Sequence, residues 1–292
     1  KGSMFSPANG RNIEYRVYTP PGYNPKLATR YPVVFSLHGA GGVPSQRANN
    51  YAPTLDQKIT SGQIMPMIWV CPDGQNNSYY GNAFDGHKQV ASHIVDELVP
   101  KIDATFKTIA NRDHRALEGF SMGGFGAGLY AATDAELFSA TLLYGSALPT
   151  WTKLTRKEPT ISLEMYNNVE ANWLPYSIWD ATKANAAQIA ATVNYKLICG
   201  SADGQMANNV LFRDYLISLG IDPHFYVAPG VAHAGTMYHA EGTGLTFLHD
   251  HFLSKRPPAA AALPLPEPAS GLLLGLALCA LAHGRRRAPR TS

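Results

Sequence analysis

Short apolar runs that end abruptly in glycine, serine, aspartate or histidine recur along this sequence, and they constrain its fold more than any other feature. The clearest are residues 31–37 before His38, 64–71 before Pro72-Asp73-Gly74, and 195–199 before the loop that holds Asp203. Continuous apolar runs of this length are typical of strands buried on both faces of a parallel sheet. Helical patterns separate them, so we expect an α/β fold with a doubly wound, mostly parallel sheet and helices on both faces.

The alternation continues to about residue 253. Strands are expected at residues 11–20, 31–37, 64–71, 115–120, 140–144, 195–199 and 224–228, and helices at 90–106, 122–132, 208–219 and 243–253. The helix over 90–106 should bend near Pro100, because proline lacks a backbone donor and clashes with the preceding turn. In such sheets the chemistry collects outside the carboxyl ends of the strands, and every catalytic candidate below follows a predicted strand.

The candidate nucleophile is Ser121, in the pattern Gly119-Phe120-Ser121-Met122-Gly123. A G-x-S-x-G sequence between a strand and a helix makes a sharp turn that lifts the serine hydroxyl above the sheet. The small residues after it predict a helix that packs closely on the sheet, and the start of a helix favours negative charge near the serine. The competing interpretation is a glycine-rich turn without chemistry.

A serine hydroxyl needs a neighbouring base to attack a carbonyl at neutral pH. His233 follows the last predicted strand, and the chain order of serine, acid and histidine is that of α/β-hydrolases. His38 is a rival, but it precedes the serine and belongs to a glycine-rich loop. The histidines at 239, 249 and 251 lie in or near the closing helix and are expected on the surface.

Asp203 is the candidate acid, because a carboxylate after the penultimate strand can orient the imidazole and stabilise its protonated form. Two alternatives remain open. Asp180 is typical of a helix N-cap, and Asp222 lies in a turn before a proline.

The loop His38-Gly39-Ala40-Gly41-Gly42 resembles the glycine-rich oxyanion loop that follows the third strand of such folds. We expect the backbone N–H groups of Ala40 and Met122 to form the oxyanion hole, with Gly41 as an alternative donor. A plain glycine turn is the other interpretation.

Together these segments resemble the putative-esterase family, which includes esterase D-like enzymes, feruloyl esterases, acetyl esterases of plant polysaccharides and mycolyltransferases. The resemblance rests on the loop 38–42, Cys71-Pro72-Asp73-Gly74, the run 119–127, the Asp203 loop and Gly230-Val231-Ala232-His233, and it covers about residues 10–255. It implies an α/β-hydrolase fold and cofactor-free acyl transfer through an acyl-serine. The implied substrates are acyl, acetyl or feruloyl esters of polysaccharides, or small esters.

The segment 146–180 lies where such folds place a lid or a pocket wall, and it is rich in aromatic residues. Trp151, Trp173 and Trp179 are candidates for a substrate pocket, together with His38 and Gly41 of the glycine loop. A hydrophobic patch that holds a loop down explains the aromatic residues equally well.

Charge and cysteine content exclude other classes. The formal net charge of +3 comes from C-terminal arginines, namely Arg285, Arg286, Arg287 and Arg290. The rest of the chain is near neutral, so no nucleic-acid-binding face is expected. The cysteines lack metal-ligand spacing, and no metal site is expected. Cys71 and Cys199 are predicted to be buried free thiols, although a disulfide between them stays open.

The C-terminal part predicts a domain boundary, with a catalytic domain over 1–256, a Pro/Ala linker over 257–265 and a tail over 266–292. The tail joins Pro266-Glu267-Pro268, an apolar run of about 14 residues and an arginine cluster. As a helix that run is roughly 21 Å long, short for a bilayer core of about 30 Å. Positive charge behind it would hold that end in the cytoplasm.

This ending resembles the PEP-CTERM sorting signal, in which an exosortase recognises Pro-Glu-Pro and removes the tail. The resemblance implies export in a Gram-negative bacterium, transient membrane insertion of the tail and a final place in the cell envelope, at the cell surface or outside the cell. An ordinary anchor or a disordered end is the alternative. The sequence begins at Lys1 without methionine or an apolar leader, so we interpret the chain as processed or truncated.

Three functions are compatible with these patterns. The leading one is a serine carboxylic ester hydrolase. An acyltransferase would use the same acyl-serine with an alcohol as acceptor, and a non-catalytic surface-binding homologue would keep only the fold.

Overall fold

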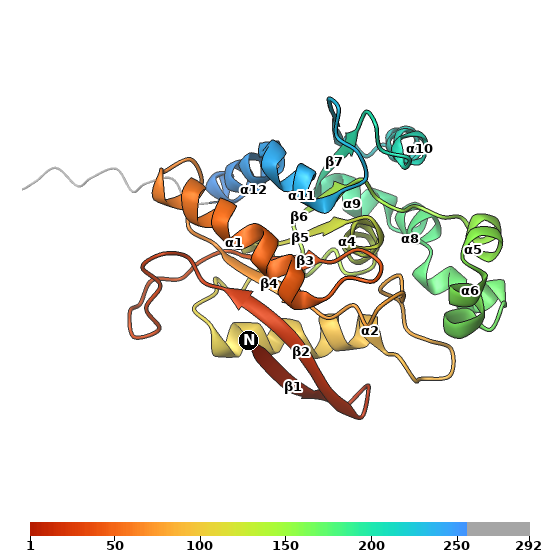
Figure 1. Cartoon of the computed structure of the whole chain (residues 1–292), viewed down its shortest axis with the longest axis horizontal. Helices are drawn as coiled ribbons and strands as arrows, with labels where there is room; N and C mark the ends of the chain where they lie inside the picture. Colours follow the sequence, from red (N-terminus) through yellow and green to blue (C-terminus); the bar gives the residue numbers. More distant parts are fainter. Residues whose placement is uncertain (256–292) are drawn as a thin grey trace, which may run out of the picture. The chain divides into compact units, whose positions relative to one another are not determined.

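An eight-stranded sheet organises the part of the chain that the computed structural model describes, residues 1–255 (Figure 1). The strands are β1 (Gly2–Ser6), β2 (Arg11–Tyr18), β3 (Val33–Leu37), β4 (Ile68–Pro72), β5 (Arg115–Phe120), β6 (Ala140–Tyr144), β7 (Asn194–Gly200) and β8 (His224–Ala228). Their order across the sheet is β1-β2-β4-β3-β5-β6-β7-β8.

In this order the six strands from β4 to β8 are parallel to one another. At the other end of the order, β2 pairs antiparallel with both β1 and β4. Every residue of β3, β4 and β6 is buried, which explains their continuous apolar runs. The predicted α/β-hydrolase fold is confirmed, and β5, β6 and β8 have the predicted bounds. Strand β1 was not predicted, because this short edge strand pairs only with β2 and carries no apolar run.

Helices cover both faces of the sheet (Figure 1). On one face α1 (Pro44–Thr60), α11 (Gly235–Glu241) and α12 (Thr243–Ser254) enclose a core that includes Tyr51, Trp69 and Phe252. On the other face six helices contribute residues to a second core, which includes Phe125 and Leu216. The six helices are α2 (Val90–Ser92), α3 (Val99–Thr105), α4 (Met122–Thr133), α8 (Ile178–Ala184), α9 (Ala186–Thr192) and α10 (Met206–Ser218).

The helix predicted over 90–106 is present, but its irregularity is not at the proline itself. Between α2 and α3 the chain forms a π-helical stretch, η1 (His93–Leu98), which ends just before Pro100. Proline cannot donate to the carbonyl four residues back, and a wider turn accommodates that loss. The remaining short elements are η2 (Arg112–His114), α5 (Trp151–Lys157), α6 (Pro159–Tyr166), α7 (Glu170–Trp173) and η3 (Leu174–Tyr176).

Two parts of the sequence gave no helix prediction although the structure forms helices there. Helix α1 contains Pro53 and has only Tyr51 and Leu55 as large buried apolar residues, so its apolar periodicity is weak. Five short helices, α5 to α9, occupy 151–192, where the sequence showed only an aromatic-rich segment. Their packing against the body of the protein stabilises them, because helices this short are marginal alone.

Cys71 and Cys199 are buried free thiols, as predicted.

His251 was expected on the surface, and this prediction is wrong. The residue is 4% exposed, and its Nε2 lies 2.7 Å from Ser139 Oγ. His249 is half-buried, and its Nδ1 accepts a hydrogen bond from the N–H of Met65. Asp180 is the third residue of α8, and Ser177 is the N-cap.

The predicted linker over 257–265 and tail over 266–292 lie outside the described residues, so the proposed domain boundaries stay a prediction. Within residues 1–255, no helix is long and apolar enough to cross a membrane. The same range contains no cluster of three histidine, cysteine, aspartate or glutamate side chains suited to a metal ion.

Candidate active site

Ser121 lies at a tight turn between β5 and α4, with φ 56° and ψ −117°. A residue other than glycine rarely adopts this backbone conformation, so the surrounding parts of the protein must impose it. A Cβ at Gly119 would lie 2.0 Å from the carbonyl oxygen of Gly123, and one at Gly123 would lie 2.1 Å from that of Leu37. A Cβ at Gly124 would lie 2.0 Å from Ser146 Oγ. Glycine is therefore required at positions 119 and 123, where the opposing atoms are backbone, whereas at position 124 the Ser146 side chain would have to move to admit a Cβ.

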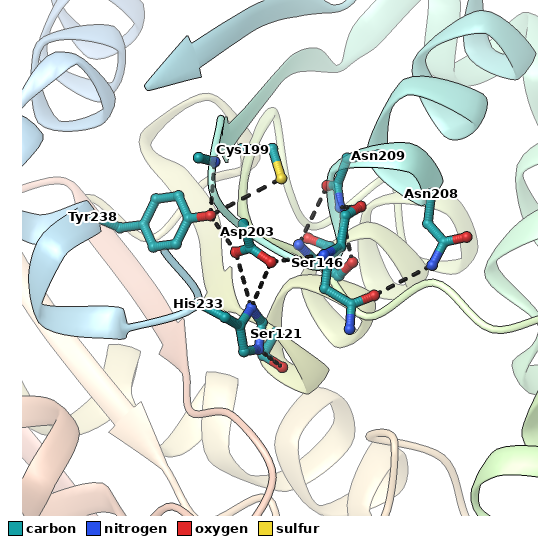
Figure 2. A network of polar contacts seen from close by, with 10 residues as sticks. Ser121, Ser146, Cys199, Asp203, Asn208, Asn209, His233 and Tyr238 are labelled. Carbon is teal, nitrogen blue, oxygen red and sulfur yellow. Dashed lines mark hydrogen bonds and ion pairs between the residues drawn. The ribbon is translucent and has the colours of Figure 1, made fainter. Parts of the chain in front are cut away.

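Three side chains from distant parts of the chain meet in one hydrogen-bonded row (Figure 2). His233 Nε2 lies 3.0 Å from Ser121 Oγ, and its Nδ1 lies 2.9 Å and 3.0 Å from the two carboxylate oxygens of Asp203. Ser121 follows β5, Asp203 follows β7 and His233 follows β8. All three therefore stand at the carboxyl edge of the sheet, as the sequence predicted.

The carboxylate of Asp203 is buried, with the residue only 4% exposed. Burial alone would raise its pKa, but hydrogen bonds from His233, Tyr238 and the N–H of Gln205 outweigh that cost and hold the pKa below the ordinary 3.8. Asp203 is thus ionised at neutral pH and keeps a proton on His233 Nδ1. That tautomer leaves Nε2 free to accept the proton of Ser121.

Tyr238 is a buried residue that sequence reasoning missed. Its hydroxyl donates to Asp203 Oδ2 and accepts from the N–H of Gly200 at 2.8 Å (Figure 2). Gly145, with φ +46°, makes room for this pair, since a Cβ there would lie 2.5 Å from Asp203 Oδ2. Tyr238 belongs to α11, a short helix that carried no sequence signal.

An aromatic ring supports the imidazole from one side. The ring centroids of Phe120 and His233 are 4.7 Å apart, and the planes are inclined by 35°. Phe120 also contacts Tyr238, with centroids 5.7 Å apart. Phe120, which occupies the variable position before the serine in the G-x-S-x-G pattern, thus packs against the imidazole of His233.

The loop after β6 is fixed to the nucleophile by an amide side chain (Figure 2). Buried Asn209 accepts from the N–H of Ser146 at 3.2 Å and donates to the carbonyl oxygen of Ser146 at 2.9 Å. The next N–H, of Ala147, donates to the carbonyl oxygen of Ser121 at 3.0 Å. This chain of contacts limits the movement of the Ser121 backbone.

A buried ion pair lies immediately before the turn. Glu118 of β5 contacts the guanidinium of Arg47 from α1, and it also accepts from Ser36 Oγ at 2.7 Å and Tyr51 Oη at 3.2 Å. Burial raises the pKa of Glu118, and Arg47 only partly offsets this effect. The sequence did not show that Glu118 is buried, because its partner Arg47 is 71 residues away.

The glycine loop 38–42 is anchored by His38, which is 2% exposed. His38 Nε2 accepts from the N–H of Gly74 at 2.9 Å, so Nδ1 carries the proton and donates to the carbonyl oxygen of Gly39 at 2.8 Å. Both ring nitrogens are occupied, and His38 cannot serve as base for Ser121. Gly41 has φ +69°, which favours glycine.

Ala40 and Met122, the predicted oxyanion residues, line one cleft with Ser121 and His233. Met122 is the first residue of α4, where backbone N–H groups have no partner within the helix. The arrangement brings the two predicted backbone donors to the cleft that contains the nucleophile.

The comparison with known sequences decides the family. The profile of the family described as "Putative esterase" matches residues 6–207, more than half of the chain. The chain belongs to this family.

Curated relatives are longer proteins that match over part of their length. Esterase Rv1288 of Mycobacterium tuberculosis is 38% identical over 128 residues, which are 43% of this chain and 27% of that protein. An endo-1,4-beta-xylanase/feruloyl esterase of Xylanibacter ruminicola is 30% identical over 145 residues, 47% of this chain and 20% of that protein. The chain thus spans about a quarter of the length of these relatives.

Solved structures share the fold. A ferulic acid esterase superposes with a TM-score of 0.72 at 23% identity, covering 86% of this chain and 96% of its own. An S-formylglutathione hydrolase from Agrobacterium tumefaciens gives 0.67 at 20% identity, covering 87% and 92%. At this identity the likeness shows the esterase-family fold and nothing finer.

The cleft at Ser121 has a volume of about 400 Å³. Its walls come from Tyr79, from the loop after β6 and from α5, and they consist of Ala147, Leu148, Pro149, Lys153, Lys157, Glu158 and Gln205 besides the residues already named. A second cleft of about 420 Å³ lies on the other side of Ala40. It is lined by the loop 38–42 and by polar side chains of α1 and α11, among them Gln46, Asn50 and Thr236.

The three predicted pocket tryptophans lie away from the cleft at Ser121. Trp173 is 1% exposed and stacks on Phe125 in the core. Trp179 packs edge-on against Phe212, and Trp151 lines a separate, smaller depression together with Trp173 and Trp179. The aromatic-rich segment thus attaches α5 to α9 to the body of the protein. Of the predicted pocket residues, His38 and Gly41 line the second cleft.

Proposed function

We propose that this chain is a serine carboxylic ester hydrolase. The observation that carries the proposal is the hydrogen-bonded row of Ser121, His233 and Asp203 at the carboxyl edge of the sheet. Membership of the esterase family supports it independently.

In the first half of the reaction Ser121 Oγ attacks the ester carbonyl carbon and His233 Nε2 takes the hydroxyl proton. The oxyanion that forms accepts hydrogen bonds from the N–H groups of Ala40 and Met122. Collapse breaks the bond to the alcohol oxygen, which receives the proton from His233. In the second half water attacks the acyl-serine by the same steps, releasing the acid and restoring Ser121.

The substrates we propose are acetyl, feruloyl or other acyl esters of polysaccharides, or small esters. The second cleft, beside Ala40, supports a polar alcohol, because Gln46, Asn50 and Thr236 offer amide and hydroxyl groups to hydroxyl-rich ligands. A family relative named as a feruloyl esterase supports aromatic acyl groups.

The test compares wild type with Ser121→Ala on 4-nitrophenyl acetate, butyrate and ferulate. We expect Ser121→Ala to lower kcat by about 10⁴-fold or more, because triad residues act as a unit. Exposed Ser61, at the end of α1, gives the matched control Ser61→Ala, which should keep wild-type rates. Equal rates for wild type and Ser121→Ala would refute the proposal.

A fluorophosphonate probe separates the alternatives that share this fold. Labelling of wild type and of Ser61→Ala, but not of Ser121→Ala, is expected of an enzyme. Lack of labelling would favour a non-catalytic homologue. Product analysis with a sugar acceptor distinguishes the acyltransferase, which would form a new ester instead of the free acid.

We also propose that the protein is exported in a Gram-negative bacterium and that an exosortase removes the tail 266–292 after transient membrane insertion. The support is the sequence alone, namely Pro266-Glu267-Pro268, the apolar run and the arginine cluster. Mass spectrometry of the chain from cells with and without an exosortase tests this. Loss of the tail is expected only with the exosortase and not in a Glu267→Ala variant. An intact tail in both strains would contradict it.

A further inference from the structure

Helix α5 brings charged side chains into the wall of the cleft that contains Ser121 and His233. Lys153, Lys157 and Glu158 line this cleft, whereas Arg156 of the same helix does not. Lys153 is half-buried, and Lys157 and Glu158 are exposed. Nothing in the family resemblance or in the reaction of Ser121 requires positive charge at this place.

The two lysines lack a partner of opposite charge. Among the described side chains of residues 1–255, which exclude those of 239–241, neither Lys153 nor Lys157 has a carboxylate oxygen within 4.0 Å, although Glu158 shares the cleft. Burial, and next the charges of Lys157 and Arg156, lower the pKa of Lys153. The structure therefore holds Lys153 in surroundings that disfavour its charge.

Helix stability does not explain the position of Lys153. Arg156 and Lys157 are in the last turn of α5, where cations interact favourably with the helix dipole. Lys153 is the third residue of the helix, where the same dipole disfavours a cation. A cation that is half-buried, unpaired and badly placed for its helix, yet lines the cleft of the nucleophile, is best explained by a negatively charged ligand.

The rest of the cleft has a different character. Its lining includes Ala147, Leu148 and Pro149, which lead along the chain to α5, and the ring of Tyr79. Ala147 lies beside the nucleophile, because its N–H donates to the carbonyl oxygen of Ser121 at 3.0 Å. Burial, and then the charge of Glu158, raise the pKa of Tyr79, so its hydroxyl stays protonated. An occupant would thus contact apolar groups near the serine and positive charge further away.

We infer that the ester substrate carries a carboxylate group, which lies against Lys153 and Lys157 while its carbonyl carbon is at Ser121. This inference rests on the proposed esterase function and names the substrate class of that same site. The carboxylate belongs to the acyl chain, as in a half-ester of a dicarboxylic acid, or to the alcohol, as in an acylated uronic acid. The shared chemistry is an ester with a carboxylate beyond an apolar spacer.

Matched substrate pairs test the inference in two arms. The acyl arm compares mono-4-nitrophenyl adipate with 4-nitrophenyl hexanoate, which has the same chain length without the charge. The alcohol arm compares 4-acetoxybenzoate with 4-acetoxybenzamide. In each arm the readout is the ratio of kcat/KM for the charged and neutral ester, which cancels any general loss of activity.

We expect the double variant Lys153→Gln, Lys157→Gln to lower this ratio about three- to tenfold in one arm, mainly through KM, as for partly exposed ion pairs. Arg156→Gln removes the same charge from the same helix outside the cleft, and its ratio should change less than about twofold. Glu158→Gln should raise the ratio. The arm that responds identifies the part of the substrate that carries the carboxylate.

An unchanged ratio in both arms for the double variant would overturn the inference. An equal effect of Arg156→Gln would also overturn it, since that result indicates long-range charge instead of a site.

A binding measurement separates failure of this inference from failure of the esterase function. Calorimetric titration of the full-length Ser121→Ala protein with mono-4-nitrophenyl adipate needs no turnover. Adding Lys153→Gln and Lys157→Gln to that background should weaken the affinity about three- to tenfold. Hydrolysis of neutral esters with no change in this affinity would disprove the carboxylate site alone. Affinity that depends on the lysines, without hydrolysis, would disprove the esterase function alone.

Discussion

The two halves of the site at Ser121 are built in different ways. The nucleophile half is held by backbone atoms at close range: Gly119 and Gly123 each occupy a position where a single carbon would overlap a backbone carbonyl group. The acid–base half is held by polar side chains from three separate segments, with Asp203 after β7, His233 after β8 and Tyr238 in α11.

The acid–base half also contains a close backbone contact. A Cβ at Gly200 would lie 2.0 Å from the carbonyl oxygen of Val231. That contact sets how closely the loops after β7 and β8 approach each other. The serine is thus oriented mainly by close backbone contacts, within the turn at Gly123 and with Leu37 of β3, whereas the base is oriented mainly by side-chain hydrogen bonds.

Because of this difference, substitutions in the two halves should affect stability and activity to different extents. A change in the nucleophile half should damage folding and catalysis together, because it displaces the backbone. A change in the acid–base half should damage catalysis with a smaller loss of stability, because a side chain is lost while the loops remain. The predictions below follow from this distinction.

The largest effect is expected from His233→Ala. Loss of the base should lower kcat by about 10⁴-fold or more, whereas the free energy of unfolding should fall by only about 1 kcal/mol. The side chain is 37% exposed, and Asp203 keeps its bonds from Tyr238 and the N–H of Gln205. Steady-state kinetics and urea unfolding measure the two quantities. If the free energy of unfolding fell by as much as the loss of activation free energy that corresponds to the fall in kcat, the two halves would not differ in the way described.

The next effect is expected from Gly123→Ala in the nucleophile half. The new methyl group would overlap the carbonyl group of Leu37, so the glycine loop or α4 must move. We expect a loss of about 3 kcal/mol in the free energy of unfolding, together with most of the activity.

The matched control for this variant is Gly204→Ala, next to Asp203. A Cβ at Gly204 would have no atom within 4 Å, and its unfolding free energy should change by about 0.5 kcal/mol or less. Similar losses for the two alanine variants in urea unfolding would contradict the steric explanation.

A smaller effect is expected from Tyr238→Phe. The phenylalanine keeps the packing but removes one hydrogen bond to Asp203 and the acceptor for the N–H of Gly200. As a positioning residue, Tyr238 should contribute to kcat and not to KM, and we expect kcat to fall about tenfold with KM unchanged. An effect on KM alone would argue against a role in orienting Asp203.

The smallest effect concerns pH. Because the folded-state pKa of Asp203 lies below its ordinary 3.8, the unfolded chain binds this proton first as pH falls. The stabilisation from Asp203 is complete above about pH 4 and is lost as pH falls through the folded-state pKa. Unfolding free energies of wild type and Asp203→Asn between about pH 2 and 6 should converge at the acid end. Parallel curves would show that Asp203 is not stabilised in the folded state.

Those regions whose structure depends on nearby residues were predicted well from the sequence. The bounds of β5, β6 and β8 were predicted from short strand-like segments, and the turn at Ser121 followed from its flanking glycines. Features that depend on distant partners were missed. The ion pair of Arg47 with Glu118 could not be predicted, because its partners are 71 residues apart. Helix α1 was missed because its apolar periodicity is weak. The tryptophans of 151–179 stayed open between a pocket and a hydrophobic patch, since sequence does not distinguish a ring in a cleft from one in the core.

The sequence by itself determined the alternation of strands and helices, the position of the nucleophile and the leading candidates for its two partners. Backbone sterics within a few residues and the period of apolar residues are encoded locally, and this is why they could be predicted. Only the tertiary structure decided that Tyr238 holds Asp203, that His38 anchors a loop, and that Lys153 faces the cleft. Each of these depends on which distant surfaces pack together, and that packing is a property of the whole fold and not of any one segment.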